Sequence, residues 1–194
     1  MNYRSRRSTG FTLIELMVTL ALAAVLLTIA VPSFVAYQRN SELTSVANNF
    51  IAALNAARTE AMKRNLNAMV IPSNKDTDWS KGWIVFVDVD RNNTFDSGTD
   101  IVIFQQDAPL PYISVSGVGT AADSPLSYVM YDASGFSKTN TGGFGASTVQ
   151  ISRNDASATD FAQIRRVKIS SVGRVRVCTP KSATDTACSS TNDS

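Results

Sequence analysis

An apolar run from Phe11 to Val31 constrains this chain more than any other part of its sequence. The run holds twenty-one residues, and its one charged side chain is Glu15. At about 1.5 Å of rise per residue, a helix of this length crosses a hydrocarbon core of roughly 30 Å. A carboxylate inside a membrane is costly unless it finds a partner. The simplest interpretation of the run is an anchor, but Glu15 favours a functional segment.

The ten residues before the run, MNYRSRRSTG, carry three arginines and no acid. By the positive-inside rule, this end stays in the cytoplasm and the chain after Val31 crosses the membrane. An ordinary secretory signal has its small-residue cleavage site after a shorter apolar region, whereas here the small residue, Gly10, precedes the run. We therefore expect the run to survive processing as a single-pass anchor of the inner membrane, with a periplasmic domain after it.

The stretch GFTLIELMVTLALAAVLLTIAVPSF resembles the class III leader and N-terminal helix of type IV pilins and type II secretion pseudopilins. In that family a prepilin peptidase cuts after the glycine and methylates the new N-terminus, which implies cleavage between Gly10 and Phe11. Glu15 then becomes the fifth residue of the mature chain and Pro32 the twenty-second, as in the family's pattern. The resemblance implies that Glu15 pairs with the free amine of Phe11 on a neighbouring subunit, because a buried charge is tolerated when it is paired.

The same resemblance implies partners and a location. The partners are other minor pilins, the major pilin, the prepilin peptidase and the inner-membrane assembly platform. The protein would leave the inner membrane for a cell-surface filament on assembly. No cofactor is expected.

Length and composition limit what the rest of the chain can be. The 194 residues leave about 160 outside the leader and the membrane run, which is enough for one globular domain. The net charge is +2 and the chain has no histidine. Histidine is the commonest general base and the commonest metal ligand, so its absence from the sequence argues against an enzyme.

Two cysteines, Cys178 and Cys188, stand near the C-terminus with nine residues between them. The expected topology places them in the oxidising periplasm, which favours a disulfide. Closing so short a loop would stabilise the fold by about 2 to 3 kcal/mol and tie the tail to the last strand. The alternative is a pair of free thiols or half of a metal site, for which the sequence offers no further Cys or His.

After Pro32 the apolar residues follow a helical period, so we expect one amphipathic helix that continues the membrane segment to about Asn65. Pro32 is expected to kink it, because proline removes a backbone donor and crowds the preceding turn. The stretch LNAARTEAMKRN, with Arg58, Glu60 and Arg64, resembles the helix end of the H-type pseudopilin (GspH), FimT and FimU family. A helix exit with one charged face is sufficient to explain it. The apolar positions are Leu43, Val46, Ala47, Phe50, Leu54, Ala57 and Ala61.

Beyond the helix, the apolar period drops to two or to short runs, which predicts strands. A long helix against antiparallel sheets is an α+β architecture, and it agrees with the pilin fold that the N-terminus implies. The stretches SNKDTDWSKGWIVFVDVDRNNTFDSGTDIVIF and RVKISSVGRVRV resemble the same family, whereas we identify no such resemblance for residues 107–160. The expected strands are NAMVI, GWIVFVDV, DIVIFQQ, PYISVS, LSYVMY, STVQIS, RRVKIS and RVRVC.

These features divide the chain into four parts. We expect a leader at 1–10, a membrane or filament-core half of the helix at 11–32 and an amphipathic half at 33–65. A β-rich periplasmic domain at 66–194 then closes with the disulfide loop.

The segment DVDRNNTFDSGTD gathers oxygen-bearing side chains at alternating positions, as a Ca²⁺ loop does. The candidate ligands are Asp88, Asp90, Asn92 and Asp96. An EF-hand loop would need glycine at Asn93 and helices on both sides. We favour the alternative, a hairpin turn in which Asp and Asn side chains cap the backbone and accept left-handed conformations.

The C-terminal segment FAQIRRVKISSVGRVRVCTPK holds six cations and no acid. On a strand, residues two apart project to one face, so two pairs of cations would form a ridge able to bind successive phosphates. Gly173 would let the backbone turn tightly into it. The candidate DNA-binding residues are Gly173, Arg174, Arg176, Arg165, Arg166 and Lys168.

The GRVR stretch, 173–176, resembles a motif by which some FimT-type minor pilins contact double-stranded DNA in natural transformation. Family members that only build filaments also end in a Gly-Arg strand. Charge on an edge strand needs no ligand, because it discourages aggregation. A plain edge strand or subunit contact therefore stands beside the DNA hypothesis.

Three functions from different classes follow. The favoured one is a minor pilin or pseudopilin that helps to initiate or cap a type IV pilus or a type II secretion pseudopilus. The second is a DNA-binding minor pilin that acts in DNA uptake. The third, an enzyme, lacks an identifiable nucleophile and base.

Overall fold

A computed structural model describes residues 10–191 of the chain. The chain divides into two compact units, one ending at Asn40 and one formed by Ser41–Ser194. The first unit holds the beginning of helix α1 (Leu13–Arg64), whose large apolar side chains there are exposed. Among the described residues, this helix is the one long and apolar enough to cross a membrane, with a mean hydropathy of 2.5 over its most apolar stretch.

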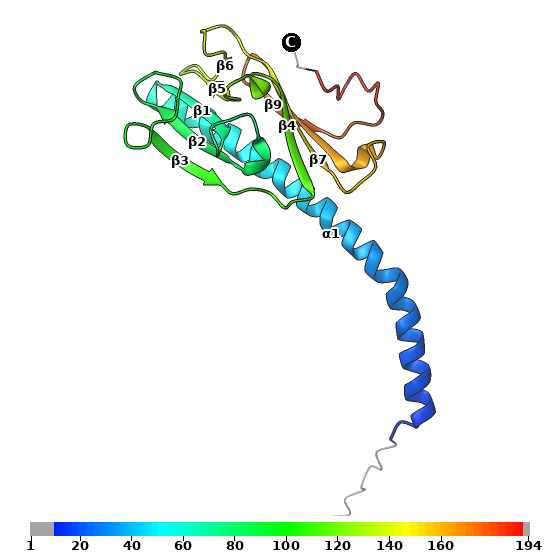
Figure 1. The fold of residues 1–194 in the computed structure, drawn as a ribbon. Helices are drawn as coiled ribbons and strands as arrows, with labels where there is room; N and C mark the ends of the chain where they lie inside the picture. Colours follow the sequence, from blue (N-terminus) through cyan, green and yellow to red (C-terminus); the bar gives the residue numbers. More distant parts are fainter. Residues whose placement is uncertain (1–9, 192–194) are drawn as a thin grey trace, which may run out of the picture. The chain divides into compact units, whose positions relative to one another are not determined.

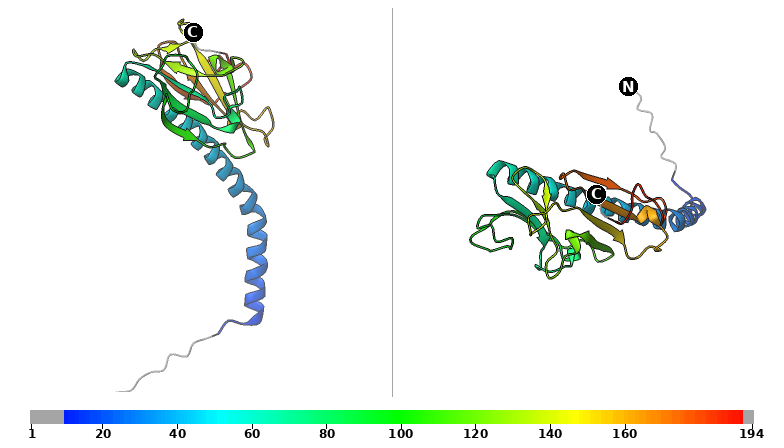
Figure 2. Two further views of the ribbon diagram at one scale, coloured as in Figure 1. Left: turned by 60° about the vertical axis from the view of Figure 1, so that its left-hand side comes forward. Right: turned by 90° about the horizontal axis from the view of Figure 1, so that it is seen from above.

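The second unit packs the rest of helix α1 with two antiparallel sheets (Figures 1 and 2). One sheet has the strand order β3-β2-β1-β5-β6 and the other the order β4-β7-β8-β9. Three short 3-10 helices, η1 (Trp79–Lys81), η2 (Thr120–Ala122) and η3 (Phe161–Gln163), connect the strands of the described chain. The strands are β1 (Asn67–Pro72), β2 (Trp83–Asp88), β3 (Ile101–Gln106), β4 (Ile113–Gly119), β5 (Val129–Tyr131), β6 (Ser137–Lys138), β7 (Ser147–Arg153), β8 (Ile164–Ile169) and β9 (Val175–Cys178).

One apolar core joins this part of helix α1 to both sheets. The helix contributes an apolar stripe at the spacing of its turns, and several of its members are alanines, which let the sheets approach the helix closely. The expected core positions are confirmed, with Val46 only partly buried. The buried helix residues are Leu43, Ala47, Phe50, Ala53, Leu54, Ala57 and Ala61.

Phe50 lies at the aromatic centre of this core. Its ring meets the ring of Trp79 edge-on at 5.4 Å between centroids, and that of Trp83 at 5.1 Å. Edge-to-face pairs at this separation are favourable beyond the area they bury. The indole of Trp79 also donates a hydrogen bond of 2.8 Å to the carbonyl of Ala121, which fixes its orientation.

The first sheet is covered on both of its faces. Every residue of β2 is buried, because one face meets the helix and the other meets loop residues around Phe95 and Leu126. A strand buried on both sides is expected to be continuously apolar, which explains the run WIVFV. The loops over the outer face therefore belong to the folded core.

The α+β architecture expected from the sequence is confirmed. Helix α1 ends at Arg64, and Asn65 follows with a left-handed φ of 56°, close to the expected end. Helix α1 continues through Pro32. All eight expected strand segments contain a strand. The two-residue strand β6 was not predicted, because so short a segment has no measurable period.

We expect Phe50→Ala to destabilise the Ser41–Ser194 unit by about 3 to 5 kcal/mol, because it removes a fully buried ring and leaves a cavity. In a thermal melt this corresponds to a loss of about 6 to 20 °C in Tm. Asn49→Ala, at an exposed position on the same helix, is the control and should change Tm by less than about 2 °C. Equal melting of the two variants would contradict the proposed role of the ring.

Candidate functional site

The start of helix α1 places the side chain of Glu15 against its own backbone. The Glu15 carboxylate accepts hydrogen bonds of 2.9 Å from both the amide and the hydroxyl of Thr12. The Thr12 hydroxyl in turn accepts a bond of 3.2 Å from the amide of Glu15. This reciprocal arrangement is a capping box, which satisfies amides that the first turn leaves without partners. Glu15 therefore has a local partner within a single copy of the chain.

The acidic segment after β2 forms a hairpin loop that leads to β3. Asp88 is fully buried, and its two carboxylate oxygens accept bonds from the amides of Asn92 at 3.2 Å and Asn93 at 3.0 Å. Arg91 and Asn93 adopt left-handed backbone conformations, as the turn hypothesis predicts. Burial raises the pKa of the Asp88 carboxyl, and the hydrogen bonds from the loop amides oppose that rise.

Three carboxylates in this loop come close enough to hold a cation. Asp88, Asp90 and Asp100 each offer an oxygen atom within 4.8 Å of the others. The loop itself already uses these oxygens, since Asp100 accepts bonds from the amides of Val89 and Asp96 at 2.9 and 2.8 Å. Of the sequence candidates, Asp96 lies outside this group of three. The hydrogen bonds are those of a self-capped turn.

The side-chain amide of Asn92 forms hydrogen bonds to three other residues of the loop. Its nitrogen donates to Asp90 at 2.9 Å and to Asp96 at 2.6 Å, and its oxygen accepts from the amide of Thr94 at 2.7 Å. An amide group between two carboxylates supplies a donor that neutralises part of their repulsion. Asn92 therefore stabilises the loop without any ligand.

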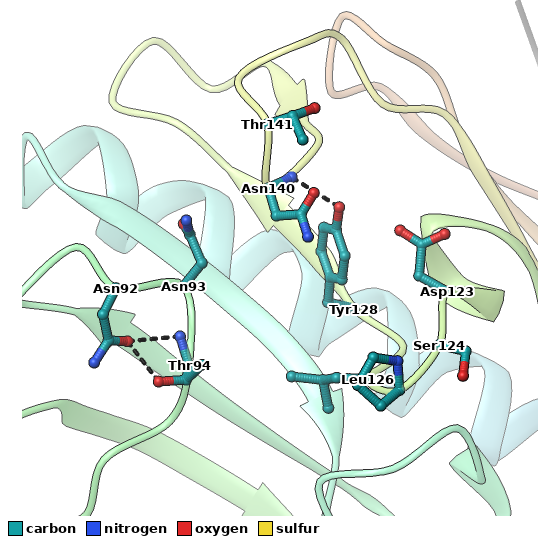
Figure 3. Close-up of a pocket in the computed structure, with 10 residues that line it drawn as sticks. Asn92, Asn93, Thr94, Asp123, Ser124, Leu126, Tyr128, Asn140 and Thr141 are labelled. Atoms are coloured by element: carbon teal, nitrogen blue, oxygen red, sulfur yellow. Dashed lines mark hydrogen bonds between the residues drawn. The ribbon is translucent and has the colours of Figure 1, made fainter.

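A polar pocket of about 360 Å³ opens beside this loop, and sequence reasoning missed it (Figure 3). Tyr128 lies at its centre, and its hydroxyl accepts a bond of 2.8 Å from the amide of Asn140. Burial raises the pKa of the Tyr128 hydroxyl. The other walls come from the acidic loop and from the segment before β5. No sequence signal marked the pocket, because its residues come from three segments distant in sequence.

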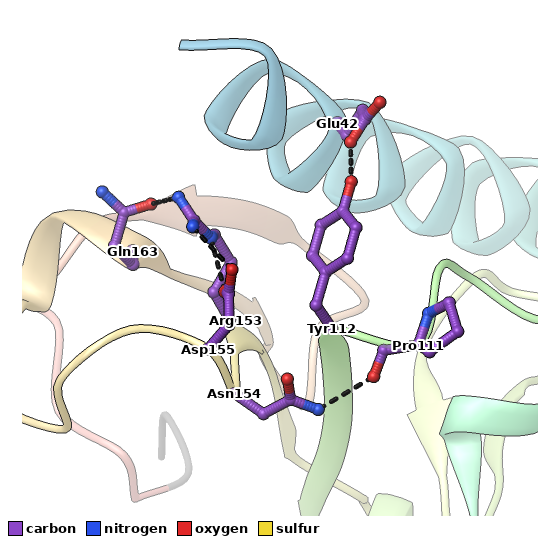
Figure 4. A network of polar contacts seen from close by, with 7 residues as sticks. All are labelled: Glu42, Pro111, Tyr112, Arg153, Asn154, Asp155 and Gln163. Carbon is purple, nitrogen blue, oxygen red and sulfur yellow. Dashed lines mark hydrogen bonds and ion pairs between the residues drawn. The ribbon is translucent and has the colours of Figure 1, made fainter. Parts of the chain in front are cut away.

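A second polar network lies where β4 and β7 meet helix α1 (Figure 4). The Tyr112 hydroxyl donates to the Glu42 carboxylate on the helix. Nearby, Arg153 forms an ion pair with Asp155 at 2.9 Å and donates to Gln163 at 3.1 Å. The hydrogen bonds that Arg153 donates to the Asp155 carboxylate raise the pKa of the Arg153 guanidinium. These contacts attach the ends of the second sheet and carry no evident chemistry.

The basic C-terminal segment does not form the continuous exposed ridge that the sequence suggested. Arg165 lies on the core side of β8, where it donates to Ala162 at 2.7 Å and reaches Thr44 on the helix at 3.4 Å. Arg166 and Lys168 project to the other face but are only 8% and 1% exposed. For Arg166 and Lys168 the prediction of a solvent ridge is wrong, because the chain's own tail covers them. The candidate Arg165 is half-buried beside the helix.

Arg174 is the cation that the structure leaves exposed at the turn between β8 and β9. The expected tight turn at Gly173 is confirmed, with a left-handed φ of 78° and a bond of 2.9 Å from its amide to Ser170. A Cβ atom at Gly173 would lie 2.0 Å from the carbonyl oxygen of Gly135. No other residue fits there without moving the backbone. Arg176 is half-buried and donates to the carbonyl of Ala187 at 2.9 Å.

The expected disulfide between Cys178 and Cys188 is present and joins the end of β9 to the tail. The Asp185 carboxylate inside the closed loop accepts bonds from the amides of Lys181, Ala187 and Cys188 at 2.9 to 3.2 Å. These hydrogen bonds lower the pKa of the Asp185 carboxyl. The loop is therefore held by a covalent link and by one carboxylate at its centre.

Comparison with known proteins gives a consistent result. Residues 46–173 match the family described as Type II transport protein GspH, and residues 5–31 match the Prokaryotic N-terminal methylation motif. No curated protein matches the chain.

Among solved structures, the chain is similar to the type IV minor pilin FimU of Pseudomonas aeruginosa. One crystal form is 21% identical with a TM-score of 0.52, covering 75% of this chain and 98% of that chain. A second crystal form is 23% identical with a TM-score of 0.49, covering 72% and 98%. The first comparison shows that the fold is pilin-like, as the resemblance of the N-terminus implied.

Addition of millimolar Ca²⁺ to the Ser41–Ser194 unit is expected to leave its Tm unchanged within about 1 °C, since a ligand stabilises only the state that binds it. Differential scanning fluorimetry with Mg²⁺ as the matched control tests this. A Ca²⁺-specific rise in Tm that Asp88→Asn abolishes would show that the loop is a metal site.

Proposed function

This chain belongs to the GspH family of type II transport proteins, and on that premise we propose that it is a minor pilin or pseudopilin. In this role it helps to initiate or cap a type IV pilus or a secretion pseudopilus. The observation that carries the proposal is one helix with two kinds of surface. Its beginning is apolar and exposed around one carboxylate, and its end is built into a folded domain.

Processing would convert the capped N-terminus into an assembly signal. We propose cleavage after Gly10 by a prepilin peptidase, followed by methylation of Phe11. Before cleavage, residue 11 has no free amine, and Glu15 is satisfied by Thr12. After cleavage, the amine of Phe11 on a neighbouring subunit offers a charged partner, and charge-assisted hydrogen bonds are roughly twice as strong as neutral ones. Pro32 would interrupt the hydrogen bonds of the filament-core helix.

The parts of the chain would then have separate roles. Residues 1–10 are the leader, 11–32 the membrane or filament-core half of the helix, 33–65 its amphipathic half and 66–194 the periplasmic domain. Other minor pilins and the major pilin are the proposed partners, with the assembly platform of the inner membrane. The family and the fold are those of structural subunits, so we propose no catalytic role.

A second candidate function, contact with double-stranded DNA during uptake, is favoured by the placement of Arg174. The side chain is exposed at a turn whose backbone is fixed against Gly135. A guanidinium on a rigid support binds phosphate with little loss of freedom. Half-buried Arg176 is the next cation along the strand. Two cations make a weaker site than the five candidate cations of the sequence hypothesis.

Glu15→Ala is expected to abolish incorporation into filaments while leaving the protein in the membrane, because the variant cannot neutralise the N-terminal amine of its neighbour. Immunoblots of sheared filaments and of membrane fractions measure both pools. Thr19→Ala is the matched control, since the Thr19 hydroxyl bonds only within its own helix, to the carbonyl of Leu16. Normal assembly of the Glu15 variant would contradict the proposed pairing.

If the DNA candidate is correct, fluorescence anisotropy will detect salt-sensitive binding of the full chain to a labelled 20-bp duplex. Arg174→Ala/Arg176→Ala should weaken it and make the log–log salt slope shallower by about 0.9 for each lost phosphate contact. Lys63→Ala/Lys81→Ala removes two exposed cations elsewhere and should weaken binding less. No binding by the wild type at low salt would reject this candidate.

A further inference from the structure

The last part of the chain that the structure describes, residues 182–191, forms a strap over the outer face of the second sheet, drawn in red in Figure 1. The strap is attached mainly through its backbone carbonyls, although Lys168 also donates to the hydroxyl of Ser189 at 3.1 Å and the Cys188 side chain is buried. Arg176 donates to the carbonyl of Ala187 at 2.9 Å, Arg166 to that of Cys188, and Lys168 to that of Ser189 at 3.4 Å. Thr148 also donates to the carbonyl of Thr191 at 3.0 Å.

The surface under the strap is an ordered grid of polar side chains on β7, β8 and β9. Thr148, Lys168 and Arg176 lie opposite one another across the three strands, and Gln150, Arg166 and Cys178 form the next row. Rows of this kind repeat about 6.8 Å along a strand, and strands lie about 4.8 Å apart. We call this grid the covered face. Its three cations are Arg166, Lys168 and Arg176, and Lys168 lies opposite Arg176.

The strap has no apolar anchor of its own. Its sequence, SATDTACSST, contains no apolar side chain larger than alanine apart from Cys188. Burial of so little apolar surface contributes little stability at roughly 25 cal/mol per Å². The disulfide, the Asp185 caps and the carbonyl contacts therefore hold the strap in place.

The carbonyl oxygens of the strap occupy the places where anionic oxygens would bind more strongly. Hydrogen bonds between a cation and an anion are shorter and stronger than those between a cation and a neutral carbonyl. A row of phosphates supplies such oxygens along an extended backbone. Release of the strap would expose Arg166, Lys168 and Arg176 beside Arg174, which is already exposed.

We propose that the strap is a disulfide-held cover over a binding face for the phosphodiester backbone of a nucleic acid. This inference rests on the second candidate function and adds its regulation. The covered face binds weakly while the disulfide is intact and strongly once the disulfide opens. Recognition is independent of base sequence, because only cations and phosphates take part.

Opening requires a dithiol reductant. One of its thiolates attacks a sulfur of the Cys178–Cys188 bond, forms a mixed disulfide and releases the other cysteine as a thiolate, which takes up a proton. The second thiol of the reductant then attacks the mixed disulfide. The reductant leaves as a cyclic disulfide, and the protein keeps two thiols. Two electrons and two protons pass from the dithiol to the cysteine pair.

The test uses the full chain in a non-ionic detergent and a fluorescein-labelled 20-bp duplex, with anisotropy measured across a salt series. Four proteins are compared. The first is the oxidised wild type, and the second is the serine variant Cys178→Ser/Cys188→Ser. The third adds Arg166→Gln/Lys168→Gln to the serine variant, and the fourth adds Lys63→Gln/Lys81→Gln to it. The last is matched in charge and removes exposed cations outside the covered face.

The serine variant is expected to bind at least about tenfold more tightly than the oxidised wild type, with a salt slope steeper by about 2 to 3, since each new phosphate contact adds about 0.9. Arg166→Gln/Lys168→Gln should cancel most of this gain, and Lys63→Gln/Lys81→Gln should retain it. Equal binding by the serine variant and the wild type would overturn the proposal. Arg174-dependent binding that the serine substitutions do not change would leave the second candidate function standing alone.

Hydrogen exchange of the wild type before and after dithiothreitol treatment distinguishes release of the strap from unfolding of the sheet. The proposal requires faster exchange at residues 186–191 while β7 and β8 remain protected. Unchanged exchange of the strap would show that the disulfide does not hold it. Loss of protection in β7 and β8 would show that the disulfide supports the whole sheet. Either result would overturn the proposal.

Discussion

The packing of helix α1 between two sheets is the constraint on which the rest of the globular unit depends. One core takes residues from the helix and from strands of both sheets, so neither sheet can bury its inner face without the helix. Alanines on the buried stripe set how closely the sheets approach, and Phe50 fills the space between two tryptophans. The loops and turns that connect the strands are supported by this continuous core.

The same helix meets a different requirement in its first part. There the apolar side chains surround the helix without a stripe, and they are exposed in a single copy of the chain. Such a surface needs lipid or other apolar helices around it. The capping box at Thr12 supplies hydrogen-bond partners to the Glu15 carboxylate within a single copy of the chain. One continuous element thus carries both an exposed apolar surface with one carboxylate and the support for the folded unit.

The sequence predicted those features whose cause is local. Periodicity located the end of the helix and eight strands, the expected periplasmic location of the cysteines indicated their bond, and glycine chemistry indicated the turn at Gly173. The burial of Arg166 and Lys168 was not predictable in this way. Alternating polar residues on a strand normally indicate a face exposed to water. Here a polar segment about twenty residues later covers them. That segment has no apolar pattern from which the contact could be predicted. The pocket around Tyr128 escaped notice for the same reason, because its walls come from segments that meet only in the folded chain.

The close approach of Gly173 to Gly135 has a consequence for how this surface can diversify. The two segments touch through main-chain atoms, so the position of the turn does not depend on the side chains that flank the contact. Val172 and Arg174 both project into solvent from this fixed backbone. Substitutions there change the chemistry that the turn displays without moving the turn itself. The close contact of Gly173 with the carbonyl of Gly135 thus gives the side chains at 172 and 174 a fixed backbone support.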